Sequence, residues 1–270
     1  MDTRRFLTVT GGVVAAGAVG VGVLAATGEV PLPRQVRARI DDPGGTIPPD
    51  VAVGDVRLET RRSAARGTDV GFFTAVPAGY GDGAGLPICL VLHGASATTA
   101  DFERFGLPQF LTVAVESGVP PFVLVGVDGG TARWEGGDGD DPQAMLRDEV
   151  PAWCVERGFD AERVAAHGWS MGGYGSLLLA GLNPGWLRAV AVLSPAVGGG
   201  TLETVLDRVD GSRTAVWCGT SDPLYDDVQG FVDRVPGGVA VAEYAPGAHT
   251  RTYWNTVTVD ALRFVGQSFA

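Results

Sequence analysis

Six short runs of apolar residues recur along the chain from residue 88 onward, and each run ends in Gly, Ser, Asp or Pro. They are residues 88–94, 122–130, 163–170, 190–195, 214–222 and 239–247. Within the runs the apolar residues are continuous rather than alternating, which is typical of parallel strands buried on both faces. Stretches that suit helices, such as residues 142–158 and 172–182, separate the runs. The pattern predicts an α/β fold with a mostly parallel central sheet and helices on both faces.

Two earlier segments extend this prediction toward the N-terminus. Residues 56–60 and 70–76 alternate more clearly between apolar and polar side chains, as expected for an antiparallel hairpin at the edge of the sheet. A length of 270 residues is usual for one α/β domain. We expect that domain to span residues 51–270, because residues 29–50 contain prolines, arginines and little periodicity and therefore predict an extended linker.

The first 28 residues have the pattern of an export signal. Arg4 and Arg5 precede a stretch of apolar and small residues from 7 to 26, and small residues follow near position 28. The paired arginines resemble a twin-arginine signal, and a general secretory signal fits nearly as well. Because residues 7–26 are also about long enough to span a bilayer, a retained membrane anchor is the alternative. We expect a secreted or cell-envelope protein.

Charge and cysteine content exclude several classes of function. The formal net charge of -11 at pH 7 argues against a nucleic acid partner, because that interaction needs a basic patch. All 20 basic residues are arginine, so the chain has no lysine for Schiff-base or phosphate-loop chemistry. Of the three cysteines, Cys89 and Cys218 lie in apolar runs and predict buried free thiols. No cysteine has metal-ligand spacing to another, so we expect no metal site among them. We also expect a monomeric protein.

The segment HGWSMGGYG, residues 167–175, places Ser170 between glycines two positions away on either side. In a chain with 41 glycines this motif alone is weak evidence. Its position is more specific, because a predicted strand ends directly before Ser170 and a predicted helix follows directly after it. A nucleophile elbow requires this strand, sharp turn and helix, with glycines that prevent collisions around the serine. The position predicts that Ser170 is a catalytic nucleophile.

A serine hydroxyl needs a base that removes its proton, and the chain has only three histidines. His249 follows the last predicted strand and precedes the last predicted helix, residues 258–269. His167 lies three residues before Ser170, where we expect it to pack against the sheet. His93 ends an earlier strand, where we expect it to shape the following loop. We therefore predict that His249 is the base.

The base in turn needs an acid that fixes its tautomer, and this acid should follow another strand. Asp222 ends the run 214–222, whereas Asp226 and Asp227 come a short turn later. We predict Asp222 as the acid, with its two neighbours as alternatives. The resulting chain order of serine, aspartate and histidine is that of the α/β-hydrolases, and differs from the chymotrypsin and subtilisin orders.

Two backbone N–H groups are expected to stabilise the oxyanion that forms during acyl transfer. One belongs to Met171, which follows the nucleophile, and the other to Ala95, in the loop after the strand 88–94. The alternative for the loop that contains Ala95 is an ordinary turn.

The irregular loop 128–143 is long enough to be functional. We predict that Trp134 within it forms a wall of the substrate pocket, with simple packing as the alternative.

The same loop carries an acidic run formed by Asp138, Asp140 and Asp141. Clustered carboxylates are ligands that calcium prefers. We favour a solvated loop over a calcium site as the explanation of this run.

Four segments together resemble a family of esterases that includes esterase D, the enterochelin and feruloyl esterases and the bacterial mycolyltransferases. They are LVLHGAS, HGWSMGGYGSLLLA, GTSDPLY and PGAHTRTYW. The resemblance covers about residues 70 to 268 and implies an α/β-hydrolase fold, a serine nucleophile and no cofactor. By motif position it matches Ser170, Asp222 and His249 to catalytic residues. Many members have an aromatic or acidic residue soon after the histidine, where this chain has Thr250 and Arg251, a difference that bears on the substrate.

The leading hypothesis is an exported serine esterase that hydrolyses a small-molecule or glycolipid ester through an acyl-enzyme. About twenty residues separate the runs 190–195 and 214–222, too few for the large lid that many hydrolases insert there, so we expect an open site. An acyltransferase that passes the acyl group to a sugar hydroxyl uses the same chemistry and is one alternative. A catalytically silent cell-envelope binding protein with the same fold is the other.

Overall fold

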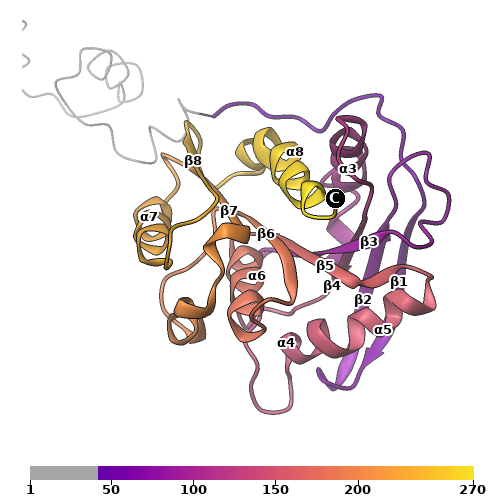
Figure 1. The fold of residues 1–270 in the computed structure, drawn as a ribbon, viewed down its shortest axis with the longest axis horizontal. Coiled ribbons are helices and arrows are strands. Elements are labelled where there is room, and N and C mark those ends of the chain that lie inside the picture. Colours follow the sequence, from indigo (N-terminus) through magenta and orange to yellow (C-terminus); the bar gives the residue numbers. More distant parts are fainter. Residues whose placement is uncertain (1–41) are drawn as a thin grey trace, which may run out of the picture.

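A single eight-stranded sheet organises residues 42–270, the part of the chain that this computed structural model describes (Figure 1). The strands lie in the order β1-β2-β4-β3-β5-β6-β7-β8. The pairs β1 with β2 and β2 with β4 are antiparallel, and every other neighbouring pair is parallel. The strands are β1 (Val56–Ser63), β2 (Thr68–Ala75), β3 (Pro87–Leu92), β4 (Val123–Val127), β5 (Asp160–Trp169), β6 (Leu187–Leu193), β7 (Thr214–Gly219) and β8 (Val241–Ala245).

Helices cover both faces of the sheet (Figure 1). On one face, α3 (Leu107–Glu116) and α8 (Arg251–Gln267) pack together and form one apolar core with the inward side chains of the strands. On the other face, a second apolar core lies beneath α5 (Val150–Glu156), α6 (Met171–Leu182) and α7 (Tyr225–Arg234). Residues Pro142–Ala144 form α4, and the π-helical turn η2 (Met145–Glu149) joins it to α5. The predicted α/β-hydrolase architecture is confirmed. Because helices cover both faces, the strands β3, β4, β6 and β7 are almost entirely buried, whereas the edge strand β8 is partly exposed.

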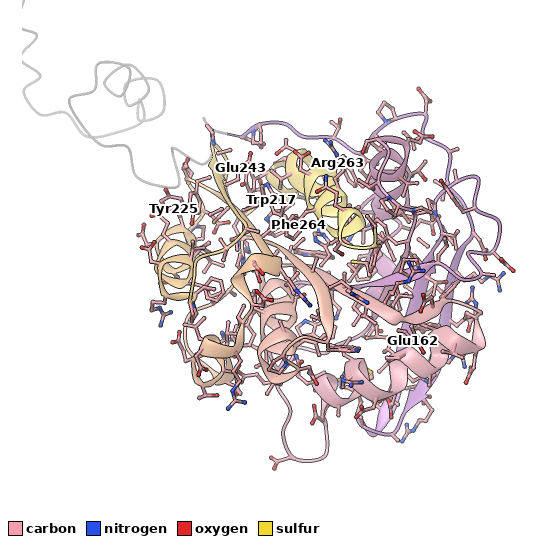
Figure 2. All side chains as sticks on the ribbon, viewed as in Figure 1. Glu162, Trp217, Tyr225, Glu243, Arg263 and Phe264 are labelled. Carbon is pink, nitrogen blue, oxygen red and sulfur yellow. The ribbon has the colours of Figure 1, made fainter. Side chains whose placement is uncertain are left out.

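The side chains at the β7 and β8 edge illustrate this layering. Trp217 of β7 donates its Nε1–H to Glu243 of β8 at 2.9 Å, and its ring meets Phe264 of α8 edge to face, with centroids 6.5 Å apart (Figure 2). One indole thus joins two strands and the covering helix. The three cysteines are free and buried, as predicted for Cys89 and Cys218, and burial raises the pKa of the Cys218 thiol to about 12.

The connection from β6 to β7 contains only short 3-10 turns: η3 (Thr201–Thr204), η4 (Leu206–Arg208) and η5 (Gly211–Arg213). Its length allows one helix, but its first half contains three consecutive glycines, Gly198 to Gly200, and two of them have positive φ. Such residues disfavour a continuous helix. No large lid covers the sheet within the described chain, as the short connection predicted.

The last helix begins earlier than the sequence pattern suggested. We expected it from residue 258, but α8 starts at Arg251, because the Thr250 hydroxyl accepts a hydrogen bond from the Tyr253 N–H and caps the first turn. The cap places the N-terminus of this 17-residue helix two residues after His249.

The predicted signal or anchor, residues 1–28, lies outside the described residues, as does most of the predicted linker. The described end of that linker, residues 42–50, contains no helix or strand and runs along the domain. Its Gly45 carbonyl accepts a hydrogen bond from the Asn255 side chain of α8 at 3.1 Å. Within residues 42–270, none of the helices combines the length and apolar character needed to cross a membrane.

Candidate active site

Ser170 occupies the sharp turn between β5 and α6 at the carboxyl edge of the parallel strands. Its backbone has φ 55° and ψ −121°, a strained conformation for a residue with a side chain. Hydrogen bonds hold the turn: the Ser170 N–H donates to the Leu193 carbonyl, and the Ser170 carbonyl accepts from the N–H groups of Tyr174 and Ala196. The predicted strand, turn and helix context of the serine is confirmed.

The glycines around the serine are a steric requirement. A Cβ on Gly168 would lie 2.4 Å from the Gly172 carbonyl oxygen, and a Cβ on Gly172 would lie 1.9 Å from that of Leu92. Both distances are far below van der Waals contact, so a larger residue at either position would displace backbone. The β5–α6 turn therefore packs directly against the end of β3.

We expect Gly172→Ala to lower the free energy of unfolding by about 1–3 kcal/mol or more, because overpacking forces the β3 carbonyl away. The displacement should also slow labelling of Ser170 by an active-site probe. Thermal unfolding and labelling rate measure the two effects. Gly230→Ala in α7 is the matched control: a Cβ there meets no atom within 4 Å, so we expect a gain of about 0.5–1 kcal/mol. Equal stability of both variants would contradict the packing argument.

A chain of hydrogen bonds joins the three residues that the sequence predicted as nucleophile, base and acid. His249 Nε2 lies 2.9 Å from Ser170 Oγ, and His249 Nδ1 lies 2.9 Å from Asp222 Oδ2. Asp222 is fully buried, whereas the His249 side chain is 27% exposed. Asp222 Oδ1 also accepts the Leu224 N–H at 2.8 Å, which fixes the carboxylate. The structure brings Asp222, and not Asp226 or Asp227, to the histidine.

Trp254 holds the histidine from the side. Its ring meets the His249 ring edge to face, with centroids 4.9 Å apart and planes at 83°. Its Nε1–H donates to the Ser194 hydroxyl at 3.0 Å, and Ser194 itself has a positive φ of 45° at the end of β6. This contact could not be predicted from the sequence, because Trp254 and Ser194 are 60 residues apart. The indole restricts the histidine ring to one orientation.

The other two histidines have the structural roles expected of them. His167 is buried, its Nδ1 lies 2.9 Å from the Ala191 carbonyl oxygen, and burial lowers its pKa to about 4. His93 accepts the Gly129 N–H on Nε2 at 2.9 Å, so its proton is on Nδ1 and is donated to the Gly94 carbonyl at 2.9 Å. Burial lowers the pKa of His93, which favours this neutral form.

The His93 bond determines the direction of the Ala95 N–H. In a trans peptide the C=O and the following N–H point in opposite directions, and the Gly94 carbonyl faces His93 and the Ala97 N–H. The Ala95 N–H therefore points away from His93, and Ala95 lines the same cavity as Ser170. The Met171 N–H is at the first position of α6, where a helix leaves its N–H groups without intrahelical partners.

Asp128 fixes the far end of the loop that carries Ala95. It follows β4, and its carboxylate accepts from the N–H and hydroxyl of Thr99 at 2.8 and 2.9 Å and from the Gly71 N–H at 3.0 Å. The loop is thus held at both ends. Sequence reasoning missed Asp128, although its place directly after a buried strand was a usable signal.

A cavity of about 380 Å³ opens beside Ser170 and His249. Aromatic side chains from three elements form its walls, namely Phe105, Trp169 and Trp254, together with Arg251. The expectation that Trp134 lines the pocket is wrong. Its side chain is 0% exposed and packs behind the site, where its Nε1–H donates to the His93 carbonyl at 3.2 Å. Trp134 therefore has the alternative role considered from the sequence, which is packing within the protein interior.

Two of the three aspartates in the acidic run, Asp140 and Asp141, have partners within the protein. Arg66 forms a two-point ion pair with Asp140, and the Asp141 side chain caps α4 through the Ala144 N–H at 2.9 Å. In the described chain, no group of three or more histidine, cysteine or acidic side chains is arranged to hold a metal ion. These carboxylates order the loop.

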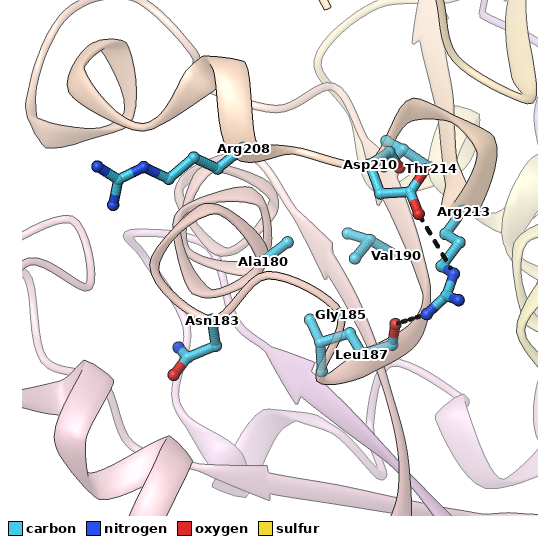
Figure 3. Close-up of a pocket in the computed structure, with 9 residues that line it drawn as sticks. All are labelled: Ala180, Asn183, Gly185, Leu187, Val190, Arg208, Asp210, Arg213 and Thr214. Atoms are coloured by element: carbon cyan, nitrogen blue, oxygen red, sulfur yellow. Dashed lines mark hydrogen bonds and ion pairs between the residues drawn. The ribbon is translucent and has the colours of Figure 1, made fainter. Parts of the chain in front are cut away.

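A smaller cavity of about 20 Å³ lies at the opposite edge of the sheet, where β6 and β7 begin (Figure 3). Arg213 crosses its mouth, paired with Asp210 at 3.3 Å and bonded to the Leu187 carbonyl at 3.4 Å. That volume holds about one water molecule. The site for chemistry is the larger cavity at the carboxyl edge, where open α/β sheets place their ligands.

The strand order and the strand, turn and helix around Ser170 are those of an α/β-hydrolase fold. The model of the family described as "Putative esterase" matches residues 63–228, more than half of the chain. The chain belongs to this esterase family of the α/β-hydrolase superfamily and is a carboxylic ester hydrolase by class. No curated protein sequence matches it.

Solved structures with the same fold include three hydrolases. A ferulic acid esterase from Anaeromyces mucronatus is 17% identical, with a TM-score of 0.65 over 84% of this chain and 96% of that one. An S-formylglutathione hydrolase from Agrobacterium tumefaciens is 16% identical, with a TM-score of 0.61 over 82% and 100%. The fluorophosphonate-binding serine hydrolase FphF from Staphylococcus aureus is 16% identical, with a TM-score of 0.66 over 79% and 99%. At these identities the likeness concerns the fold.

Proposed function

We propose that the protein is an exported serine esterase in which Ser170, His249 and Asp222 form the catalytic triad. His249 removes the Ser170 proton, the hydroxyl oxygen attacks the ester carbonyl, and the alcohol leaves with the proton returned by His249. Water then attacks the acyl-enzyme, and His249 again transfers the proton. The N–H groups of Met171 and Ala95 stabilise the oxyanion in both steps.

The observation that carries this proposal is the continuous hydrogen-bond chain from Ser170 through His249 to the buried Asp222. Acyl transfer needs a nucleophile, a base in reach and an acid that fixes the base. A binding protein without catalysis has no need to hold these three groups in line on a strained turn. The direction of the Ala95 N–H supports its role in the oxyanion hole.

Intact-mass spectrometry of the protein mixed with 4-nitrophenyl acetate tests the function. We expect a burst of 4-nitrophenol and a mass increase of one acetyl group, located on the peptide that contains Ser170. Steady release of acetate should follow. Hydrolysis without a covalent intermediate, or acetylation at another residue, would contradict the mechanism.

The absence of a large lid in the described chain supports one alternative, an acyltransferase that passes the acyl group to a sugar hydroxyl. We expect water to be the main acceptor: adding a sugar such as trehalose at millimolar concentration should change acid release by less than twofold. Chromatography of the products from short-chain, aromatic and glycolipid donors separates the outcomes. An acylated sugar as the main product would make the protein a transferase, with the triad unchanged.

The proposal of export rests on residues 1–28 alone. Expression of the full chain with a periplasmic or secreted reporter, compared with a chain in which Arg4 and Arg5 are replaced by glutamine, tests it. Unchanged export of the variant would point to a route that does not read the paired arginines.

A further inference from the structure

The guanidinium of Arg251 lies in the cavity beside the nucleophile and is held by three aromatic rings. Its Cζ is 3.9 Å from the Phe105 ring centroid, 4.6 Å from that of Trp169 and 5.1 Å from that of Trp254. Trp169 directly precedes Ser170, and Arg251 follows His249 by two residues, so the charge is fixed next to both reacting groups. A guanidinium stacked in this way is held rigidly.

Within the described part of the chain, no carboxylate pairs with the guanidinium of Arg251. The Arg251 side chain makes no hydrogen bond or ion pair with any residue between 42 and 270, although a guanidinium carries five N–H donors. The acid with a favourable charge interaction, Asp101, is already engaged: its Oδ1 pairs with Arg104 at 2.6 Å, and its Oδ2 accepts the Thr98 N–H at 2.9 Å. The three rings interact with the charge of Arg251 but supply no hydrogen-bond acceptor in their own planes for its N–H groups.

The position is unfavourable for a cation in three ways. It is largely desolvated, which together with the nearby Arg104 lowers its pKa to about 10 while leaving it charged at neutral pH. It is the first residue of α8, where the positive end of the helix dipole disfavours a positive charge. It also lacks a counter-ion among residues 42–270. An anion in the cavity would relieve all three, because the guanidinium and the helix N-terminus would both attract it.

We propose that Arg251 is the anion-binding residue of the substrate pocket, and that the preferred esters carry a carboxylate near the scissile bond. The inference rests on the proposed esterase function and adds the substrate class. The planar guanidinium pairs with a carboxylate through two parallel hydrogen bonds, and Phe105, Trp169 and Trp254 contact the apolar part of the same substrate. Arg251 is thus a specificity residue, and the triad performs the chemistry.

Two pairs of esters with matched shapes test the proposal. Mono-4-nitrophenyl glutarate is compared with 4-nitrophenyl 5-methylhexanoate, in which an isopropyl group replaces the carboxylate on the acyl side. On the alcohol side, 4-acetoxybenzoate is compared with 4-isopropylphenyl acetate. We expect the wild type to prefer the anionic member of at least one pair in kcat/KM, and the pair concerned identifies the side of the ester that carries the charge.

In Arg251→Met we expect that preference to fall by about 10- to 100-fold, mainly through KM, since charge-assisted hydrogen bonds are lost. Arg251→Lys should restore part of it because the charge returns. Arg263→Met is the matched control, because Arg263 is on the same helix, 12 residues further on, and pairs with Asp260 at 3.5 Å. The preference of Arg263→Met for the anionic ester should equal that of the wild type.

Protection from labelling gives a second measurement that does not depend on turnover. Benzoate should slow fluorophosphonate labelling of the wild type, and this protection should weaken with added salt and disappear in Arg251→Met and Arg251→Gln. An unchanged ester preference or unchanged protection in these variants would refute the anion site while Ser170 labelling and neutral ester turnover kept the esterase function intact. Absence of both labelling and turnover in the wild type would overturn the two proposals together.

Discussion

Ser170→Ala is expected to abolish covalent labelling by a fluorophosphonate probe and to lower kcat for 4-nitrophenyl esters by roughly 10⁶-fold. The substitution removes the only oxygen that lies 2.9 Å from His249 Nε2 in the described chain, so no acyl-enzyme can form at this position. What remains is the catalysis that the oxyanion donors and substrate binding supply. Gel fluorescence of the labelled protein and stopped-flow absorbance measure the two quantities.

The matched control for this variant is Ser176→Ala in the same helix. Ser176 is buried and its hydroxyl donates to the Gly172 carbonyl at 2.9 Å, so it has a structural partner and no contact with His249. We expect Ser176→Ala to label at nearly the wild-type rate. Equal labelling of wild type and Ser170→Ala would remove Ser170 as the nucleophile.

Asp222→Asn is expected to lower kcat by about 10⁴-fold with little change in the fold. The carboxylate accepts the His249 Nδ1–H, which leaves Nε2 free to take the serine proton. An amide at this position can present its NH₂ group to Nδ1 and stabilise the opposite tautomer, in which Nε2 carries a proton and cannot act as a base. Because Asp222 is fully buried, solvent cannot replace the lost charge.

Asp226→Asn and Asp227→Asn, at the start of α7, are the controls for the acid. Both residues are exposed and lie beyond the turn that places Asp222 at the histidine. We expect them to retain activity within about twofold. Near-normal turnover in Asp222→Asn, with a large loss in one of these, would transfer the acid role to that neighbour.

Much of the fold followed from the chain order of apolar runs. Buried parallel strands need continuous apolar residues, so all six predicted runs overlap β3 to β8, and the earlier pair overlaps β1 and β2. The helices were harder to predict from the sequence than the strands. α3 and α7 were not predicted, although both carry apolar residues at helical spacing. α3 follows an irregular loop, and α7 has two aspartates, Asp226 and Asp227, in its first turn.

The candidate site, too, could be predicted from the sequence only in part. Ser170, Asp222 and His249 each follow a strand of one parallel sheet, so their approach to a common edge could be inferred from the sequence. Trp134 and Trp254 could not be separated like this, since an indole in a loop or a helix has the same local pattern whether it packs in a core or lines a cavity. Trp134 lies behind His93, whereas Trp254 reaches the histidine because α8 begins at Arg251.

By itself, then, the sequence determined the α/β class, the strand-turn-helix position of the serine and the order of its two partners, because strand burial and turn sterics are local properties. Only the tertiary structure decided which side chains surround the ester. Phe105, Trp169 and Arg251 come from separate parts of the chain, and their stacking depends on where α8 crosses the sheet. The charge that we propose as the determinant of substrate class is visible only once these elements are packed together.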